Sequence, residues 1–462
     1  MKPVLLIDLG STYTKVTAVD VEKAELLGTA QSYSTVSTDI GEGLSDALKR
    51  LEEKTGYLEY EKKLACSSAA GGLRMITSGL VPELTAEAAR LACLGAGAKV
   101  IKVFSYELTD EDIKEIERLS PDILLLTGGV DGGNSKTILH NAEMLSGCNK
   151  SFPILIAGNR SAAARCEELL GEREVYRCEN VMPKLDLLNI EPVQEQIRKL
   201  FLNKIIQAKG LTKASSLLDN ILMPTPSAVL DAMELLAKGT KNQRGIGDLI
   251  GVDLGGATTD VYSMASGAPL NDSTILKGLP EPYAKRTVEG DIGMRYSAEG
   301  ILDAAGVQWL AEQSGLTPER VDELTAFIST QTDSLPDSDE LSSLDHALAC
   351  GAIETAVRRH AGTIKQVYTP TGPAFVQTGK DLTEVSRVIV TGGAIIHNKR
   401  AAEIAAFALY NKNDFESLRP KSAEIYVDRS YILAAMGLLS EQYPDEALTI
   451  IKKELEENGT HK

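Results

Sequence analysis

The sequence predicts an α/β protein built from two duplicated domains, and three observations lead to this prediction. A strand–glycine turn–strand segment occurs twice, at residues 4–20 and 249–265. A strand-like segment that contains Thr-Gly-Gly also occurs twice, at residues 123–134 and 388–398. Between these landmarks, helix-like and strand-like segments alternate, which is typical of sheets with mainly parallel strands. A repeat of this length indicates duplicated domains and not a solenoid.

The individual elements follow from hydrophobic periodicity and from turn residues. The repeated segments at 4–20 and 249–265 each predict a β-hairpin whose turn contains glycine. The rest of the first half predicts strands at 62–67, 99–104, 122–127, 153–158 and 174–178, and helices at 42–54, 83–94, 109–118, 136–146, 161–170, 191–208 and 225–239.

The polar, glycine-bearing segment 238–247 marks the expected domain boundary. Residues 331–340 predict an exposed acidic loop, and we expect the polar tail at 454–462 to be frayed. The remaining pattern of the second half predicts a strand at 388–391 and helices near 344–361 and 429–440.

The composition excludes several classes of protein. The 462 residues suffice for two or three domains and an ample hydrophobic core. Hydrophobic residues make up 43% and charged residues 24% of the chain, which excludes global disorder. The net charge of −17 predicts a surface that repels nucleic acid and anionic membranes, and the aromatic content of 5% disfavours base stacking. We therefore expect no nucleic acid and no membrane among the partners.

We expect a cytoplasmic location. The apolar stretch at residues 4–7 is too short for a signal peptide and is followed by Asp8, and no apolar run of roughly 18 residues occurs. The six cysteines form no C-x-x-C pair and no cysteine–histidine cluster with zinc spacing. Buried or free thiols in a reducing compartment are therefore expected.

The first glycine turn, from Asp8 to Lys15, carries residues suited to binding phosphate. Gly10 lets the turn expose backbone N–H groups, which form an anion-binding nest, and Ser11 and Thr12 add hydroxyl donors. Lys15 lies on the returning strand, from which its ammonium group can reach a phosphate in the turn. Asp8, at the end of a buried strand, is placed to hold hydrated Mg²⁺. A plain hairpin turn is the alternative for this motif taken alone.

The second glycine turn repeats the arrangement between Asp253 and Asp260, and so adds a further acid. Two facing nests with two acids suit a nucleoside triphosphate and its Mg²⁺, because phosphate chemistry depends mainly on positioning and charge stabilisation. Neither turn matches a Walker loop or a dinucleotide-binding turn. The residues of this second turn are Gly255, Gly256, Ala257, Thr258 and Thr259.

A third glycine turn, Gly392-Gly393-Ala394, follows Thr391 at the end of a predicted strand. Glycine at this point would let an adenine ring or its ribose approach the backbone closely. A simple strand-to-helix turn is the alternative. His397 follows the turn and is a further candidate to face the nucleotide.

Together these motifs resemble those of the superfamily that contains actin, the heat-shock chaperone ATPases and the sugar kinases. DLGSTYTK at 8–15 is similar to the first phosphate motif, DLGGATTD at 253–260 to the second, and VIVTGGA at 388–394 to the adenosine motif. Residues 223–228 and 431–439 resemble the two connecting helices. The resemblance implies two duplicated ribonuclease-H-like (actin-like) lobes that flank a nucleotide cleft, with ATP and Mg²⁺ as cofactors.

The resemblance also implies a role for each matching residue. Asp8 and Asp253 would flank the magnesium ion and, with Asp260, take the catalytic roles. Met223 stands where the heat-shock ATPases have a glutamate that helps to orient the attacking water, which puts fast hydrolysis in doubt and predicts a slow ATPase. Contacts to phosphate would come from Gly10, Ser11, Thr12, Lys15, Gly255, Gly256, Ala257, Thr258 and Thr259, and the adenosine would lie against Gly392, Gly393 and Ala394.

On this resemblance the chain divides into three parts. Residues 1–245 would form the first actin-like ATPase lobe with an α/β insertion, and residues 246–427 the second lobe. Residues 428–462 would form a helical segment that packs back on the first lobe.

Residues 68–75, 124–134 and 289–295 carry a closer resemblance, to the MutL-type accessory proteins of glutamate (methylaspartate) mutase. These proteins are unrelated to the mismatch-repair protein of that name. The resemblance implies an ATP-binding, chaperone-like reactivating factor that uses lobe closure to release damaged cobalamin from an adenosylcobalamin-dependent mutase. The implied partners are the mutase subunits, and a homodimer is left open. Within this segment, Asp291 is expected to cap the helix that follows or to contact the ribose.

A small-molecule (sugar or acid) kinase of the same superfamily is the alternative function. Such a kinase needs a catalytic base, for which Asp131 is the candidate, although a tight Asp-Gly turn also explains this residue. A filament-forming protein is disfavoured by the net negative charge. An activator of the acyl-CoA dehydratase type would need cysteines spaced to hold an iron–sulfur cluster, and the sequence offers no such pair.

Overall fold

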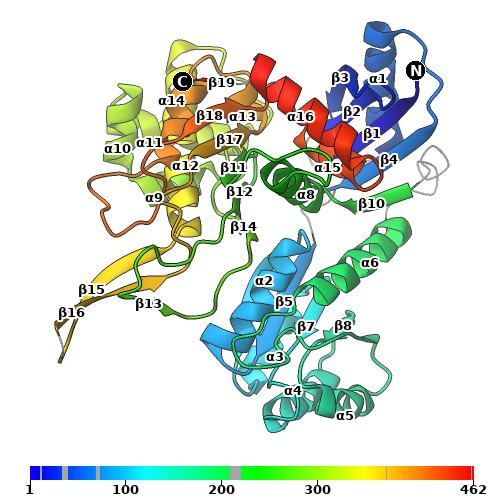
Figure 1. Ribbon diagram of the computed structural model, residues 1–462, viewed down its shortest axis with the longest axis vertical. Helices are drawn as coiled ribbons and strands as arrows, with labels where there is room; N and C mark the ends of the chain where they lie inside the picture. The colour runs from blue at the N-terminus through cyan, green and yellow to red at the C-terminus, as the bar shows by residue number, and fades with distance from the viewer. Residues whose placement is uncertain are drawn as a thin grey trace.

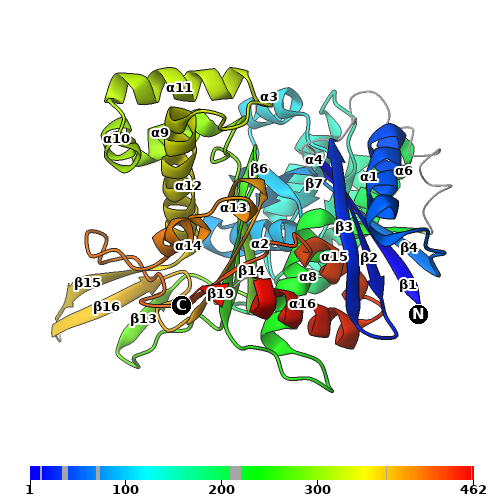
Figure 2. The same ribbon diagram turned by 90° about the horizontal axis from the view of Figure 1, so that it is seen from above.

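The computed structural model describes residues 1–10, 13–33, 40–68, 73–208, 220–370, 372–458 and 460–461. Figure 1 shows a first lobe (blue) beside a second lobe (yellow to orange), with an additional α/β unit (cyan) below them. Helices near the middle and the end of the chain lie between the two lobes, and Figure 2 shows the same arrangement from above. Among the described helices, none has the length and apolar character needed to span a membrane.

The sheet of the first lobe has the strand order β10-β4-β1-β2-β3. The strands β1, β2 and β3 pair antiparallel, whereas β4 is parallel to β1 and β10 is parallel to β4. Every residue of β1 is buried, because its alternate side chains face two different hydrophobic clusters. The elements of this lobe are β1 (Pro3–Leu9), β2 (Tyr13–Asp20), β3 (Glu25–Tyr33), α1 (Ile40–Thr55), β4 (Lys62–Ser67) and β10 (Asn220–Pro224).

The sheet of the second lobe has the order β14-β12-β11-β17-β18-β19. Its first five strands repeat the order and directions of the first sheet, with three antiparallel strands followed by two parallel ones. The predicted duplication of a ribonuclease-H-like fold is therefore confirmed. The strands are β11 (Leu249–Leu254), β12 (Thr259–Met264), β14 (Ala284–Glu289), β17 (Arg387–Thr391), β18 (Glu424–Val427) and β19 (Thr460–His461).

Helices cover the second sheet and continue to its outer side. The long helix α12 packs against β11 and β12, and its buried face is lined with small residues. The helices are α9 (Ala298–Ala305), α10 (Val307–Ser314), α11 (Pro318–Thr330), α12 (Asp339–His360), α13 (Gly393–Ile396) and α14 (Ala401–Ala405).

A third sheet, inserted between β4 and β10, has five parallel strands in the order β6-β5-β7-β8-β9. This is the strand order of a doubly wound α/β unit. Its strands are β5 (Arg74–Gly79), β6 (Lys99–Ser105), β7 (Ile123–Leu126), β8 (Ile154–Ile156) and β9 (Val175–Arg177). Its helices are α2 (Glu87–Gly95), preceded by a π-helical turn at Pro82–Ala86, α3 (Asp110–Leu119), α4 (Lys136–Ser146), α5 (Arg160–Leu170) and α6 (Glu191–Ala208).

A small sheet projects from the second lobe. Its three strands have the order β13-β16-β15, with β15 and β16 joined as a hairpin. Figures 1 and 2 both show it extending away from the body of the molecule. The strands are β13 (Thr274–Lys277), β15 (Thr363–Thr369) and β16 (Gly372–Thr378).

Three helices near the middle and the end of the chain hold the two main sheets together. Their buried side chains form one hydrophobic cluster with residues of both sheets, such as Leu6 of β1 and Tyr262 of β12. The last of these helices packs on the other two. They are α8 (Thr225–Lys238), α15 (Leu433–Ser440) and α16 (Pro444–Asn458).

The helices α8 and α15 approach each other unusually closely at Gly437. A Cβ atom at this position would lie 1.7 Å from the carbonyl oxygen of Ala228. Glycine is therefore required here to let the two helix backbones meet.

Two predicted helix starts differ from the structure because local hydrogen bonds set them. The helix α12 begins at Asp339, inside the predicted acidic loop, because the Ser338 side chain accepts a hydrogen bond from the N–H of Leu341. The helix α15 begins at Leu433 and not at residue 429. The Asp428 carboxylate accepts hydrogen bonds from the N–H groups of Ile432 and Leu433 and so defines the start of this helix.

The prediction of a frayed tail was wrong for residues 454–458. These residues belong to α16, in which Leu448, Ile451 and Leu455 form a buried apolar face. The backbone of Thr460–His461 then pairs with β18. The apolar spacing of this segment was the sequence signal for the helix.

Substitution of Gly437 tests the close contact between α8 and α15. We expect Gly437→Ala to lower the free energy of unfolding by about 2 kcal/mol, because the added methyl group forces the helices apart. Urea unfolding followed by circular dichroism measures the change. The control is Gly147→Ala, at the end of α4, where a Cβ atom would have no neighbour closer than 3.6 Å. An equal loss of stability in both variants would contradict the prediction.

Candidate functional site

The two predicted hairpins have the same register in the structure. Asp8 lies opposite Lys15 across β1 and β2, and Asp253 lies opposite Asp260 across β11 and β12. In the second hairpin the N–H of Gly255 donates a 3.0 Å hydrogen bond to the Thr258 carbonyl, which closes the turn. The repeat in the sequence therefore corresponds to two equivalent turns, in which an aspartate replaces a lysine at one position. Ser11 and Thr12 of the first turn lie outside the described residues.

Asp8 is buried and held by groups from three strands or helices. Its Oδ2 atom lies 3.0 Å from the ammonium group of Lys15. Its Oδ1 atom accepts a 2.6 Å hydrogen bond from the hydroxyl of Thr225, the first residue of α8, and lies 3.7 Å from the thiol of Cys66. The carboxylate of Asp8 is thus fixed at the point where β1 ends and α8 begins.

Lys15 lies between the two lobes. Its ammonium group is 3.7 Å from the centre of the ring of Tyr431, which lies between β18 and α15 in the chain. Burial opposes the charge on Lys15, but Asp8, Tyr431 and Asp253 stabilise it, so that its pKa lies above its usual range. Lys15 and Asp8 belong to the first lobe and Asp253 to the second, so carboxylates of both hairpins act on this ammonium group.

Asp253 differs from the other carboxylates of the site, because it makes no hydrogen bond within the described part of the chain. It is only partly buried. Burial, together with the nearby carboxylates of Asp260 and Asp8, raises its pKa to about 7, although Lys15 opposes the shift. A perturbed carboxylate that makes no hydrogen bond among the described residues is a candidate ligand for a cation or for Mg²⁺-bound water.

Asp260 forms a buried ion pair with Arg286 of β14. The Nε atom of Arg286 donates to Asp260 at 2.7 Å, and its Nη2 atom lies 2.5 Å from the same oxygen. The Nη1 atom of Arg286 also donates to the carbonyls of Leu94 and Ala98 at the end of α2, at 2.9 and 3.0 Å. One guanidinium group therefore connects the second hairpin to the inserted α/β unit.

The glycines of the turns create space where a ligand would need it. A Cβ atom on Gly256 or on Gly393 would meet nothing within 4 Å, so the backbone at both positions borders open space. Gly392 has a φ of 106°, and its missing Cβ allows contact with the Leu254 backbone of β11. The adenosine turn and the second phosphate turn are thus adjacent, and Ala394 lies next to them, half-buried.

The segment 289–297 packs directly on the second turn. The N–H groups of Met294 and Arg295 donate to the carbonyls of Gly255 and Gly256, at 3.0 and 2.8 Å. The hydroxyl of Ser297 donates to the carbonyl of Ala257 at 2.8 Å. The carbonyls of this turn are therefore paired with the protein, and the Gly255 N–H is used to close the turn. Among the described residues, the N–H groups of Gly256 and Ala257 are left as the side available to an anion.

Several residues of the site were not among the predicted ones. Asp428 is 2% exposed and accepts a hydrogen bond from Thr391 at 3.1 Å, and burial raises its pKa. Tyr431 has a φ of 53°, which places its ring over Lys15. Thr225 and Arg286 complete the group. Thr225 and Tyr431 had a sequence signal, since they lie in the segments identified as the two connecting helices.

A cavity of about 180 Å³ lies beside Lys15, at the boundary of the lobes. It is rich in cationic side chains, which include Lys54 and Arg429 in addition to Lys15. His397 also lines it, so this residue faces the space beside the first hairpin.

The residues present fit Mg²⁺ and a triphosphate. Among the described residues no group of three or more His, Cys, Asp and Glu side chains is arranged as a metal site. Mg²⁺ does not need such a group, because it keeps several waters and binds one or two carboxylates together with phosphate oxygens. The carboxylates between the hairpins outnumber the cations, which suits a divalent cation: they are Asp8, Asp253, Asp260 and Asp428, against Lys15 and Arg286.

The structure shows the surroundings of three further residues that were singled out in the sequence. Asp291 does not cap a helix; its carboxylate pairs with Arg359 at 2.9 Å, and the next helix begins only at Ala298. Asp131 is part of the loop after β7, where it accepts hydrogen bonds from the N–H of Arg160 and from Asn180, which agrees with a structural turn. Met223 is buried in the cluster between the sheets.

The sequence matches the family of MutL proteins over residues 4–455. The chain belongs to the MutL family. The MutL protein of Clostridium tetanomorphum is 48% identical over 459 residues, which cover 98% of this chain and 99% of that protein. The resemblance to MutL-type proteins deduced from the motifs is thereby confirmed.

Solved structures similar to this chain are distant in sequence. The nucleotide-free structure of an acetone carboxylase has 14% identity and a TM-score of 0.41, and the match covers 95% of this chain and 70% of that chain. The activator of the 2-hydroxyisocaproyl-CoA dehydratase from Clostridium difficile with bound ADPNP has 11% identity and a TM-score of 0.34, covering 98% and 97% of the two chains.

The raised pKa of Asp253 predicts a pH-dependent effect on stability. A carboxyl group whose pKa is higher in the folded state makes the protein less stable as the pH rises from about 4 to about 7. We expect Asp253→Asn to remove this cost and to raise the free energy of unfolding at pH 8 by at least about 1 kcal/mol. Urea titrations at pH 8 and pH 4 measure the difference, which should vanish at the lower pH. A gain of the same size at both pH values would contradict the prediction.

The buried pair between Arg286 and Asp260 predicts a large loss of stability when the cation is removed. Arg286→Met leaves the Asp260 carboxylate buried without a cation, and we expect the free energy of unfolding to fall by about 3–5 kcal/mol. The double variant Asp260→Asn, Arg286→Met should recover part of the loss. Arg320→Met, which removes an exposed ion pair with Glu340, is the control and should cost less than about 1 kcal/mol.

Proposed function

We propose that this protein is an ATP-binding, chaperone-like reactivating factor for an adenosylcobalamin-dependent mutase, either glutamate (methylaspartate) mutase or a related aminomutase. The observation that carries the proposal is the facing pair of equivalent hairpins, with the partly buried Asp253 between them. Membership of the MutL family supports the choice of partner. The protein would bind the mutase subunits as its partners and release damaged cobalamin from them.

In this function the chain would consist of a first lobe at residues 1–245, a second lobe at residues 246–427 and a C-terminal segment at residues 428–462. The nucleotide would lie between the first two parts. In support of this division, α15 and α16 of the third part pack on α8, and α15 also contacts β1 and β4.

Within the cleft, the backbone N–H groups of the turns at Gly10 and Gly256 would bind phosphate oxygens. Lys15 would stabilise the charge of the β- and γ-phosphates, for which it is already held at the lobe boundary. Asp8 and Asp253 would hold the Mg²⁺ ion, which supplies charge neutralisation on the phosphates when bound. Gly393 and Ala394 would border the adenosine.

The site holds few groups that could orient a water molecule for fast hydrolysis, so we propose a slow ATPase. At the position of the water-orienting glutamate of the heat-shock ATPases, the buried Met223 offers no acceptor. Asp260 is a second candidate for that task, but its Oδ1 is held by Arg286. Hydrolysis would then depend mainly on Asp8, which also contacts Lys15.

Closure of the lobes would change the affinity for the mutase. ATP can drive this change only if it binds the closed and the open arrangement with different affinity. Carboxylates of both lobes stabilise the charge of Lys15. A phosphate bound between the hairpins would therefore alter the balance of charges across the lobe boundary. Arg286 would pass the same change from the second hairpin to α2.

Binding of Mg²⁺·ATP tests the site. We expect Asp8→Ala and Asp253→Ala each to weaken binding at least about tenfold in isothermal titration calorimetry, because each removes a carboxylate next to the metal and phosphates. Asp322→Ala, an exposed position on α11, should leave the affinity unchanged. Unchanged binding in both site variants would reject the assignment of the site.

Recovery of an inactivated mutase tests the function. The protein is mixed with an inactivated adenosylcobalamin mutase, free cofactor, ATP and Mg²⁺, and mutase activity is measured over time. We expect recovery with ATP, no recovery without it, and a loss of recovery in Asp253→Ala. Phosphorylation of a sugar or acid in the absence of any recovery would favour the kinase instead.

A further inference from the structure

The small sheet that projects from the second lobe, formed by β13, β15 and β16, is named the arm here. In Figures 1 and 2 its outer half extends past the other elements of the second lobe, and no described helix lies over it. A three-stranded sheet normally buries at least one face against another layer. The arm is therefore a sheet whose outer part has a surface available to another molecule.

The exposed apolar side chains of the arm lie on both of its faces. Gln366 lies opposite Phe375 and Tyr368 opposite Pro373, so that Tyr368 and Phe375 share one face. These two side chains are 84% and 43% exposed. On the other face, Ile275 of β13 lies beside Val376 and is 55% exposed. Aromatic and aliphatic side chains gathered on an exposed projection are typical of a protein interaction site.

The charge of the arm is opposite to that of the whole protein. Residues 274–277 and 363–378 contain Lys277 and Lys365 but no aspartate or glutamate, whereas the chain carries a net charge of −17. Lys365 lies 3.9 Å from Glu416 outside the arm, and no ion pair is found for Lys277 among the described residues. A basic apolar projection on an acidic protein is complementary to an apolar surface with acidic side chains around it.

We propose that the arm is the docking surface for the partner protein, and that the partner presents an apolar site surrounded by carboxylates. A second copy of this chain fits less well. Two arms paired through the face that carries Ile275 would bring Lys277 and Lys365 close to their own copies. An arm bound to the acidic surface of a second copy would be a head-to-tail contact, which gives rings or open chains. The inference rests on the proposed function, which supplies the mutase as the partner.

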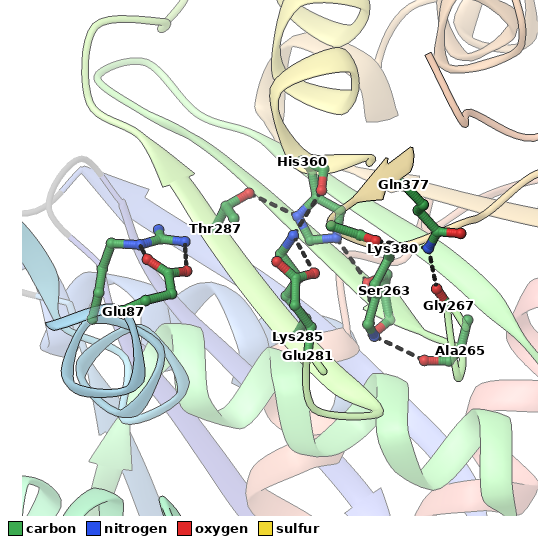
Figure 3. A network of polar contacts seen from close by, with 12 residues as sticks. Glu87, Ser263, Ala265, Gly267, Glu281, Lys285, Thr287, His360, Gln377 and Lys380 are labelled. Atoms are coloured by element: carbon green, nitrogen blue, oxygen red, sulfur yellow. Dashed lines mark hydrogen bonds and ion pairs between the residues drawn. The ribbon is translucent and has the colours of Figure 1, made fainter. Parts of the chain in front are cut away.

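The base of the arm is anchored in the second lobe by buried polar groups (Figure 3). The amide of Gln377, 1% exposed, donates to the carbonyl of Gly267 at 2.8 Å. The ammonium group of Lys380, also 1% exposed, donates to the carbonyls of Ala265 and Tyr283 at 2.8 and 2.7 Å. The arm is thus attached firmly at its base.

The same base borders the contact between the second lobe and the inserted unit. His360, at the end of α12, lies between Ser263 and Thr287, with a ring nitrogen 2.8 Å from each hydroxyl. A cavity of about 390 Å³ begins here, lined by Thr363 and Thr378 of the arm and by Arg90 of α2. A partner bound to the arm would therefore lie close to the contact between the second lobe and the inserted unit. Closure of the lobes would change this contact.

Binding to purified glutamate mutase subunits, measured by biolayer interferometry with the full-length chain, tests the proposal. We expect Tyr368→Ser, Phe375→Ser to weaken binding at least about tenfold, because exposed aromatic anchors dominate such interfaces. The variant Lys277→Glu, Lys365→Glu should weaken binding mainly at low salt, since the contribution of these charges is screened at high salt. Tyr368→Ser alone, at an 84% exposed position, provides a second test if the double variant does not fold.

The control is Tyr57→Ser, because Tyr57 is 82% exposed but lies on the first lobe. It should bind the mutase within about twofold of the wild-type protein. Binding unchanged in all arm variants would overturn the proposal, while Mg²⁺·ATP binding and reactivation would still stand. Self-association that is lost in the arm variants would instead identify a second copy as the occupant and also overturn it. Absence of mutase binding by the wild-type protein would overturn both the proposed partner and the occupant of the arm.

Discussion

The ammonium group of Lys15 is the interaction on which the rest of the site depends. It pairs with Asp8 of its own hairpin, lies over Tyr431 and is stabilised by Asp253 of the other lobe. Without this cation, the carboxylates of the two hairpins would face each other across a partly buried gap, and burial would make their repulsion costly. Lys15 therefore lowers the repulsion between the hairpins, and it leaves the Asp253 carboxylate without a hydrogen bond among the described residues.

The two duplicated hairpins compensate the negative charge of their aspartates in different ways. In the first hairpin, the residue opposite the aspartate is Lys15, so that the cation comes from the hairpin itself. In the second, the equivalent residue is Asp260, and the compensating cation is Arg286 from the neighbouring strand β14. Because Arg286 also donates to the backbone of α2, the second solution connects the hairpin to the inserted α/β unit. The two halves of the fold are thus alike in backbone and different in how they transmit a change of charge.

The arrangement of helices between the lobes sets how closely the hairpins meet. The helix α8 begins with Thr225, whose hydroxyl binds Asp8, and α15 begins at the carboxylate of Asp428, which also binds Thr391 of the second sheet. The two helices cross at Gly437, where their backbones nearly touch. A change at the hairpins is therefore connected through hydrogen bonds to both helices, and through them to each lobe. The arm lies on the far side of the second lobe, at the end of the long helix α12.

The sequence alone was sufficient to predict the duplicated architecture, because glycine turns and apolar strands are local patterns that repeat along the chain. Asp8, Lys15, Asp253, Asp260 and the turn glycines were found in this way, since each belongs to such a pattern. Arg286 and Asp428 carry no comparable pattern, and they reach the site only because strands and helices far apart in the chain become neighbours. Asp291 was misjudged as a helix cap, because the following helix begins only at Ala298, and the folded chain brings Arg359 to this carboxylate instead. Local pattern determines which elements form, whereas the partner of a charged side chain is decided only when distant segments pack together.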